Sequence, residues 1–318
     1  MIDQHGRNIE YLRLSVTERC DLNCVYCREK GVCNSVKGSA RELTPDEVRA
    51  AMREMAALGV KKVRLTGGEP LLRSDIAGLI AAVNGENGLY DLCMTTNAQR
   101  LSQYAKPLKA AGLMRVNISL DSLKPEKYRE LTRGGDINNV LHGIDAAVSA
   151  GLSPIKLNVV TVKGQNDCEI DDFIEFTRDN PVDVRFIELM PIGRFGQDES
   201  HRVYNSDILR AHPELEPVKK RCKSQPSEDY RIAGYLGRVG FISPLSHRFC
   251  EDCNRVRLTS DLKLIPCLGS ELEIDLRPVI NDAAALRSLI ESGIFNKPGG
   301  HHFNERGKDG RGMDRIGG

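Results

Sequence analysis

The sequence contains no tryptophan, and aromatic residues make up only 5% of its 318 positions. Its formal net charge is +1, so no overall field attracts nucleic acid or a membrane surface, and any anion site must be built from locally placed basic residues. No apolar run is long enough to span a bilayer, and no charged-then-apolar signal segment opens the chain. Ten cysteines are too few for a disulfide scaffold at this length. We therefore expect a reducing, cytoplasmic location with no nucleic-acid or membrane partner.

Three of the ten cysteines, Cys20, Cys24 and Cys27, lie close together directly after residues 12–17, an apolar run that predicts a strand. Thiolates select zinc, Cu(I) or iron–sulfur clusters, and a closed structural zinc site normally has four protein ligands. Three thiolates on a [4Fe–4S] cluster leave one iron open to a small molecule. This first cysteine triplet therefore indicates a catalytic cluster. A zinc knuckle completed elsewhere, or three reduced loop cysteines, are the alternatives.

The first 193 residues alternate between strand-like and helical segments, which predicts a parallel sheet with right-handed crossovers. The expected strands are residues 12–17, 62–66, 91–95, 115–120, 155–161 and 184–189. The expected helices are residues 44–59, 74–83, 101–111, 137–150 and 168–178. Thr44 to Glu47 is a capping box for the first helix, and Ser74 is the expected cap of the second. Because a full barrel needs eight strands, we predict an α/β fold with a partial (β/α)6 barrel, open on one side.

Polar groups follow the predicted strands at their carboxyl ends. They are the first cysteine triplet, residues 67–70, 95–97, 119–122 and 188–191, with Lys156 and Asn158 inside the fifth strand. In barrel-like α/β folds the chemistry is assembled at this face. We therefore expect one active site at one mouth of the barrel.

After residue 193 the chain becomes polar and irregular, and two β-hairpins are then expected near residues 230–242 and 256–265. We predict a barrel domain over residues 1–193 and a smaller α+β region over residues 194–318. The last part, residues 297–318, holds seven glycines and mixed charge, a composition typical of a flexible terminus.

A second cysteine triplet, Cys250, Cys253 and Cys267, lies on the expected hairpin turns. A zinc ribbon completed by His247 or Cys222 explains this spacing as well as an iron–sulfur cluster does.

Arg255 and Arg257 alternate on one face of the strand that follows Cys253. Two guanidinium groups pointing the same way suit a phosphate chain, although alternating arginines also occur on solvated strand faces. Next to an incompletely ligated cluster, the pair favours a nucleotide site.

Taken together, the first triplet with Tyr26, the Gly67 to Pro70 turn, the second triplet with its arginine pair, and the Gly317-Gly318 end resemble the radical S-adenosylmethionine (SAM) enzymes. Within them they resemble the GTP 3′,8-cyclase family of molybdenum cofactor biosynthesis. The resemblance extends from Leu12 to the end of the chain.

This resemblance implies two [4Fe–4S] clusters, one on each triplet, and a role for further residues. The implied SAM-binding residues are Tyr26, Gly67, Gly68, Glu69, Ser119 and Met190. The implied GTP-binding residues are Arg13, Arg64, Thr95, Lys156, Arg255, Val256 and Arg257, and the implied catalytic residues are Arg255, Arg257, Gly317 and Gly318. For Gly67 and Gly68 an ordinary strand-to-helix turn is the alternative, and for Glu69 the alternative to binding the SAM ammonium is capping the next helix.

The family chemistry implied is the conversion of GTP to 3′,8-cyclo-7,8-dihydro-GTP, a lyase reaction started by a 5′-deoxyadenosyl radical from SAM. The implied partners are GTP, a flavodoxin- or ferredoxin-type electron donor, and a downstream cyclic pyranopterin monophosphate synthase. The oligomeric state, monomer or homodimer, is left open. Two alternatives remain: another two-cluster radical SAM enzyme such as a peptide-modifying one, and a zinc-binding interaction module.

Several residues depart from the family pattern. Cys33, Cys93, Cys168 and Cys222 have no assigned role, although Cys93 is expected in the core. Arg28-Glu29 follows Cys27 where the family has Met-Pro, and Ala98 replaces the usual glycine after residues 95–97.

Overall fold

The structure is a computed structural model that describes residues 1–28 and 41–301. The strands that it describes are β1 (Tyr11–Ser15), β2 (Lys62–Thr66), β3 (Asp91–Thr96), β4 (Arg115–Ser119), β5 (Ile155–Thr161), β6 (Val182–Glu188), β7 (Glu216–Pro217), β8 (Ser227–Arg231), β9 (Val239–Ile242), β10 (Arg255–Leu258), β11 (Lys263–Ile265) and β12 (Ile274–Asp275). Its helices are α1 (Pro45–Ala57), α2 (Ile76–Asn84), α3 (Leu101–Ala110), α4 (Pro125–Thr132), α5 (Ile137–Ser149), α6 (Ile170–Asp179), α7 (Gly193–Gln197), α8 (Asn205–Ala211) and α9 (Ala283–Phe295).

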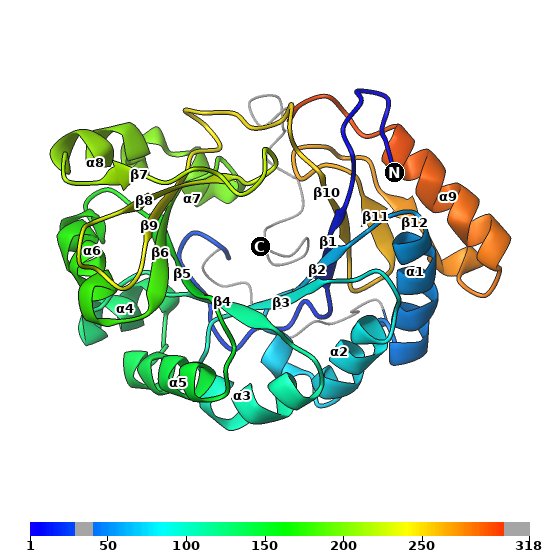
Figure 1. The fold of residues 1–318 in the computed structure, drawn as a ribbon, viewed down its shortest axis with the longest axis horizontal. Coiled ribbons are helices and arrows are strands. Elements are labelled where there is room, and N and C mark those ends of the chain that lie inside the picture. Colours follow the sequence, from blue (N-terminus) through cyan, green and yellow to red (C-terminus); the bar gives the residue numbers. More distant parts are fainter. Residues whose placement is uncertain (29–40, 302–318) are drawn as a thin grey trace.

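Strands β1 to β6 form a parallel sheet in chain order, and the helices between them lie on its outer side (Figure 1). The sheet curves around a central space without closing, because β12 and β7 form its two edges among the described residues. The predicted partial (β/α)6 barrel is therefore confirmed.

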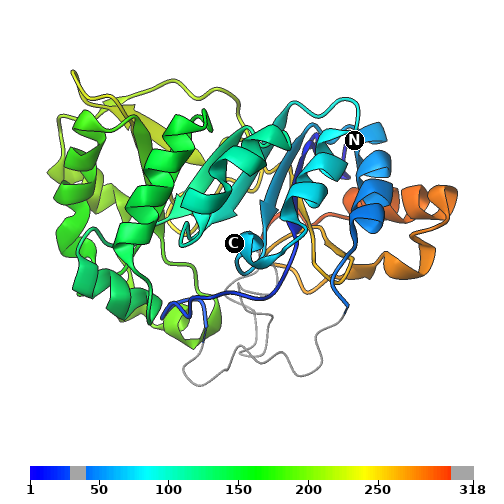
Figure 2. The ribbon, with the colours of Figure 1, turned by 90° about the horizontal axis from the view of Figure 1, so that it is seen from below.

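Both C-terminal hairpins join this same sheet. Strand β9 pairs in parallel with β6 and brings its hairpin partner β8 with it, whereas β10 pairs in parallel with β1 and brings β11. Figure 2 shows these additions beyond the two sides of the barrel sheet. The hairpins were predicted correctly, but they extend the barrel at both edges. The division of the chain at residue 193 stays a prediction.

Most local signals led to the expected elements. Thr44 and Glu47 form the reciprocal capping box that begins α1. The cap expected at Ser74 is wrong, because Asp75 occupies that position and gives its carboxylate to Arg73 at 2.6 Å instead of to the helix. Sequence reasoning also missed α4, a short and polar helix.

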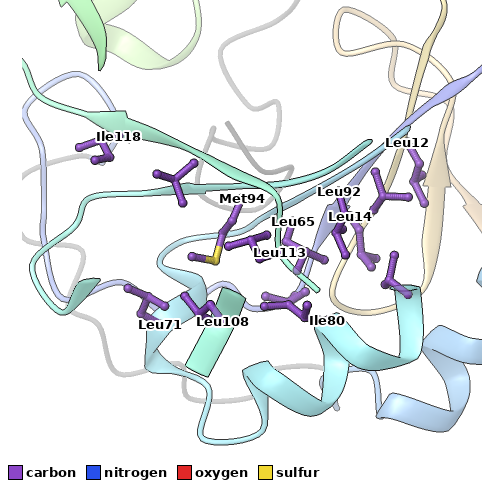
Figure 3. Packing of buried hydrophobic residues seen from close by; sticks show 14 of the residues in the cluster. Leu12, Leu14, Leu65, Leu71, Ile80, Leu92, Met94, Leu108, Leu113 and Ile118 are labelled. Carbon is purple, nitrogen blue, oxygen red and sulfur yellow. The ribbon is translucent and has the colours of Figure 1, made fainter. Parts of the chain in front are cut away.

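The hydrophobic core lies between the sheet and its helices, as Figure 3 shows. Leu12 of β1, Leu65 of β2 and Met94 of β3 pack with Ile80 of α2 and Leu108 of α3. Side chains alternate across a strand, so burying these apolar residues outward turns their polar neighbours inward. The fold thereby leaves the centre of the barrel to polar and charged side chains. Within the described residues, no helix is both long and apolar enough to cross a membrane.

Candidate active site

A cavity of about 690 Å³ occupies the centre of the barrel. All six cysteines of the two triplets line it, together with residues from every strand of the parallel sheet. A cavity of this size is typical of a small-molecule or cofactor site. The cavity is therefore the candidate active site.

The two triplets lie at opposite ends of this cavity. The first follows β1 and so lies at the carboxyl ends of the parallel strands, as expected. Cys250 and Cys253 precede β10, which runs parallel to β1, and Cys267 follows the antiparallel β11. Both positions are at the amino ends of the parallel strands. The polar groups expected at the carboxyl ends of the strands do meet and line the cavity there, and with the second triplet the site runs through the barrel from one end to the other.

The thiols of the first triplet are in an environment that suits a bound cluster. The backbone N–H of Leu22 donates to Sγ of Cys20 at 3.5 Å, and the side-chain amide of Asn97 approaches the same sulfur at 3.9 Å. Hydrogen bonds to sulfur are a feature of iron–sulfur sites. Burial raises the pKa of Cys20 to about 11 and that of Cys24 well above its ordinary value. Binding as thiolates thus requires a strongly cationic partner such as iron.

Gly67 and Gly68 bring the strand end against the first cysteine loop. A Cβ on Gly68 would lie 2.2 Å from the carbonyl oxygen of Arg19, and one on Gly67 would lie 2.3 Å from that of Thr17. The same segments are joined by backbone hydrogen bonds, from Gly68 to Thr17 and from Glu69 to Arg19. The two glycines therefore permit close packing on the cysteine loop, a reason that neither sequence interpretation included.

Glu69 is buried and its carboxylate organises the neighbouring strand end. It accepts from the backbone N–H of Leu71, from the hydroxyl of Thr96 at 2.7 Å and from the backbone N–H of Asn97 at 2.7 Å. The first of these bonds is the capping contact that was the alternative for this residue. Burial raises the pKa of Glu69 to about 7. Its contact with the SAM ammonium stays a prediction.

The other predicted SAM residues line the same end of the cavity. Tyr26, Ser119 and Met190 are all lining residues. The hydroxyl of Tyr26 donates to the buried carboxylate of Asp121 at 2.5 Å, and Asp121 also accepts from the N–H of Val160. This bond fixes the aromatic ring beside Cys24 and Cys27.

Ala98 adopts the left-handed conformation with φ of 60°. Such a conformation costs a residue with a Cβ roughly 1–2 kcal/mol. This geometry explains why glycine is usual at that position. The neighbouring departure, Arg28, donates to the carbonyl oxygen of Glu18 at 2.6 Å.

A row of arginines crosses the middle of the cavity. Arg257 of β10, Arg13 of β1 and Arg64 of β2 are direct register partners on three adjacent strands, and all three line the cavity. Neighbouring strands lie about 4.8 Å apart, so the three guanidinium groups share one level and one face. The prediction that the two arginines of β10 share one face is confirmed, since Arg255 also lines the cavity. Asn117 holds Arg64 in place. With the side-chain amide of Asn117 oriented so that its oxygen faces the guanidinium, this oxygen accepts hydrogen bonds from Arg64 at 2.9 and 3.0 Å.

The pKa values of Arg13, Arg257 and Lys156 are lowered by their surroundings, whereas that of Arg64 is raised, against the effect of burial, by Tyr11, Cys93 and Asp91. Burial, with repulsion from Arg64 and Arg255, lowers the pKa of Arg13 to about 10. Burial, with repulsion from Arg13 and Arg255, lowers the pKa of Arg257 well below its ordinary range. Burial and the nearby Arg185 lower the pKa of Lys156 to about 8. Because these positive charges are buried and repel one another, the binding of a polyanion at the site is energetically favourable.

Several buried side-chain atoms of lining residues have no hydrogen-bond partner in the described structure. Among them are the hydroxyl oxygen of Tyr11, Nε of Arg13, Oγ1 of Thr95 and Oδ1 of Asn158. Unpaired buried polar atoms are costly, and their concentration around one cavity indicates groups waiting for a polar ligand.

In the second triplet the pKa of a cysteine is lowered by its surroundings, whereas in the first triplet the pKa values of Cys20 and Cys24 are raised. Burial raises the pKa of the Cys253 thiol, but the positive charges of Arg255 and Lys297 bring it down to about 6. A thiolate is therefore available for metal at neutral pH. In the part of the chain that the structure describes, no three His, Cys, Asp or Glu side chains converge on one point as a single metal ion requires. The ligands of a cubane need not converge, because each thiolate binds a different iron.

The two candidates for a fourth zinc ligand have other contacts. His247 is 3.9 Å from Glu228, and the sulfur of Cys222 is 3.4 Å from the Ser224 hydroxyl. Cys222 lines the cavity, but its side chain is exposed. The residue set present thus fits a three-cysteine cluster at each end of the barrel.

Some predicted site residues lie elsewhere. Val256 is in the hydrophobic core on the outer face of β10, so only its backbone could reach a ligand. Gly317, Gly318 and Cys33 lie outside the described residues. Cys93 is buried, as expected, and Cys168 is exposed.

Sequence reasoning missed several cations that line the cavity, namely Lys62, Arg115, Arg185 and Lys297. Lys62 and Arg115 both pair with Asp91, at 3.0 and 2.8 Å. The first three lie on the strands at inward positions, and alternation along each strand was the signal that could have found them.

Comparison with known proteins agrees with this geometry. Residues 14–177, just over half of the chain, match the radical SAM superfamily, and residues 182–303 match the family described as Molybdenum Cofactor Synthesis C. The structure of Streptococcus suis SuiB bound to SAM has a TM-score of 0.57 at 15% identity, covering 92% of this chain and 66% of SuiB. A second structure of SuiB gives a TM-score of 0.61 over 94% of this chain and 75% of SuiB, also at 15% identity. This protein is a radical SAM enzyme.

Full-length relatives define the family more narrowly. The GTP 3′,8-cyclase of Alkaliphilus oremlandii is 46% identical over 100% of both chains. That of Peptoclostridium acidaminophilum is 46% identical over 100% of this chain and 98% of its own. The chain therefore belongs to the GTP 3′,8-cyclase family.

Proposed function

We propose that the barrel cavity is the reaction chamber of a GTP 3′,8-cyclase, which makes 3′,8-cyclo-7,8-dihydro-GTP in the first step of molybdenum cofactor biosynthesis. One observation carries this assignment. Two cysteine triplets, each one ligand short of a complete [4Fe–4S] cluster, line the opposite ends of one cavity whose middle is crossed by a row of arginines. A nucleotide triphosphate fits between two such ends.

The first triplet would hold the cluster at which SAM binds. Bound there, SAM would supply the 5′-deoxyadenosyl radical that takes the 3′ hydrogen of GTP; the ribose carbon would then join C8 of the guanine, and one electron from the electron donor with one proton would give the dihydro product. The chain's part is to position SAM. Tyr26, held by Asp121, would flank it, Gly67 and Gly68 would bring backbone close to it, and Ser119 and Met190 would complete its pocket.

The arginine row would hold the triphosphate. A triphosphate carries roughly four negative charges, and guanidinium groups match phosphate oxygens with paired hydrogen bonds. Arg13, Arg64 and Arg257 share one level, while Lys156 and Arg255 approach from neighbouring positions. Binding would offset the repulsion that, after burial, lowers the pKa values of Arg13 and Arg257.

The second triplet would hold a cluster whose open iron faces the guanine. Its position at the amino ends of the strands would put the base and the radical source on opposite sides of the ribose. The barrel wall around the cavity would limit the access of water, which protects a carbon radical from side reactions. Gly317 and Gly318 stay proposed catalytic residues.

The remaining partners are proposals drawn from the family. A flavodoxin- or ferredoxin-type protein would deliver electrons, and a cyclic pyranopterin monophosphate synthase would take the product. We also propose a cytoplasmic location and a monomer or homodimer. The peptide-modifying alternative draws on the fold likeness to SuiB, which also has a structure bound to its precursor peptide SuiA, but that likeness has 15–16% identity against 46% for the GTP 3′,8-cyclases.

Incubation of the anaerobic, reduced enzyme with SAM and GTP tests the proposal. We expect deoxyadenosine and the cyclised nucleotide to form in equal amounts. Deoxyadenosine without any cyclised nucleotide would show that the cavity activates SAM but does not act on GTP.

A further inference from the structure

Lys297 is the residue on which a further inference rests. It follows α9 and begins the segment whose composition is typical of a flexible terminus, yet its side chain is 1% exposed. It belongs to none of the motifs that define the family resemblance. A lysine is almost never buried to this degree without a specific partner.

The ammonium of Lys297 joins the two strands that carry the second triplet. Nζ donates to the carbonyl oxygen of Arg255 at 2.9 Å and to that of Pro266 at 2.6 Å. Arg255 lies two residues after Cys253, and Pro266 directly precedes Cys267. The side chain thus fixes the distance between the backbone segments of these two cysteines.

The groups that can balance the positive charge of Lys297 are cysteine thiols. An ammonium has three N–H donors, and the two carbonyl bonds use two of them. Within the described residues it has no ion pair with a carboxylate; burial lowers the pKa of Lys297, and the neighbouring groups that oppose this and favour its positive charge are Cys253 and Cys267. Since an unpaired buried charge is strongly unfavourable, the charge balance points to thiolates or an anionic cluster beside it.

The backbone at Lys297 is fastened to the third cysteine as well. The buried guanidinium of Arg7 donates to the carbonyl oxygens of Cys250 at 2.9 Å, Pro298 at 2.7 Å and Lys297 at 3.3 Å. Asp3 holds Arg7 through an ion pair of 2.7 Å. All three cysteines are therefore connected to one short segment of chain.

We propose that Lys297 is a positioning residue of the second cysteine triplet, which sets the spacing of Cys253 and Cys267 and supplies positive charge to the cluster that they hold. This inference rests on the proposed function in that it takes the second triplet as a cluster site. Nearby charge and hydrogen bonds to sulfur are among the factors that set the reduction potential of such clusters. A fixed ammonium favours the more negative, reduced form.

The test uses a chain in which only the second cluster can form. In a Cys20→Ala/Cys24→Ala/Cys27→Ala background, we would compare Lys297→Met, which keeps length without charge, with Lys297→Arg, which keeps charge. Lys109→Met is the matched control, because Nζ of Lys109 also donates to a carbonyl, that of Gly151 at 2.7 Å, far from either triplet in the fold. Iron and sulfide per chain and the midpoint potential of the cluster are measured without air.

We expect Lys297→Met to lose at least half of its iron and sulfide, and the cluster that remains to have a lower midpoint potential than the background. Lys297→Arg should retain most of the cluster and a potential close to that of the background, and Lys109→Met should match the background in both. If Lys297→Met does not fold, restoration of cluster content by arginine but not by glutamine still supports the role of charge.

Full occupancy and an unchanged potential in Lys297→Met would overturn the inference. Equal potentials in the methionine and arginine variants would also overturn it, since that result leaves only a packing role. A background protein that binds zinc or no metal would instead contradict the proposed function, so the two failures are distinguishable.

Discussion

Replacement of Arg257 by methionine should change GTP binding and protein stability in opposite directions. Arg257 is 6% exposed, is a register partner of Arg13, and has its pKa lowered by burial and by repulsion from Arg13 and Arg255. Its charge is therefore unfavourable before the substrate arrives. Methionine has a similar length and fills the space without the charge.

The size of the effect follows from the interaction that is lost. A hydrogen bond to a charged group contributes about 1.5–3 kcal/mol. Since about 1.4 kcal/mol corresponds to a tenfold change, the Kd for GTP should rise by about ten- to a hundredfold. Without GTP, thermal unfolding should occur at the same temperature or a higher one, because the repulsion along the row is relieved.

Calorimetric titration with GTP and scanning calorimetry of the anaerobic protein measure both quantities. Arg53→Met on the exposed side of α1 is the matched control and should change neither. A variant with a lowered unfolding temperature and an unchanged Kd for GTP would refute the reasoning, because Arg257 would then be a structural residue of the barrel.

Further predictions concern both ends of the cavity and its middle. The pKa of Lys156 is lowered to about 8, so the affinity for GTP should fall as the pH rises through that value and Lys156 loses its positive charge. Lys156→Arg, which keeps its charge, should abolish this pH dependence in titrations between pH 7 and 9. Gly68→Ala should push the first cysteine loop away, lower the free energy of unfolding by about 1–3 kcal/mol and reduce the iron content. Gly78→Ala in α2, where a Cβ meets nothing within 4 Å, should instead raise the free energy of unfolding by about 0.5–1 kcal/mol. Denaturant unfolding and iron analysis compare the two variants, and equal effects would contradict the packing argument. Asp121→Ala leaves the Tyr26 hydroxyl without its hydrogen-bond partner and should raise the Kd for SAM about tenfold, as measured by equilibrium dialysis. An unchanged Kd would show that this hydrogen bond does not position the Tyr26 ring.

The barrel was predictable because its signals are local. The strands follow from apolar periodicity, and the start of α1 follows from the capping box of Thr44 and Glu47, which needs only four consecutive residues. That Arg255 and Arg257 share one face of β10 also followed from alternation along one strand. Each of these inferences uses neighbours in the sequence.

The placement of the second triplet was not predictable in the same way. It depends on β10 pairing with β1, two strands separated by most of the chain. No local pattern encodes which edge of a sheet a late hairpin joins, or in which direction. The meeting of polar groups at the carboxyl ends was therefore predictable, whereas the position of the second triplet at the other end of the cavity was not.

The burial of Lys297 was not predicted, because the composition of residues 297–318, with its glycines and mixed charge, favours a flexible terminus. The structure instead holds Lys297 by contacts with Arg255, Pro266 and Arg7. All three partners are distant in sequence. Only the fold brings a lysine at that position against two cysteines.

Metal analysis of the anaerobically purified protein tests the central claim most directly. Iron, acid-labile sulfide and zinc per chain are measured for the unmodified protein and for a Cys250→Ala/Cys253→Ala/Cys267→Ala variant. The account predicts about eight irons and eight sulfides, falling to about four of each in the variant. About four irons with one zinc, the zinc lost in the variant, would contradict it, because the second triplet would then be a structural zinc site.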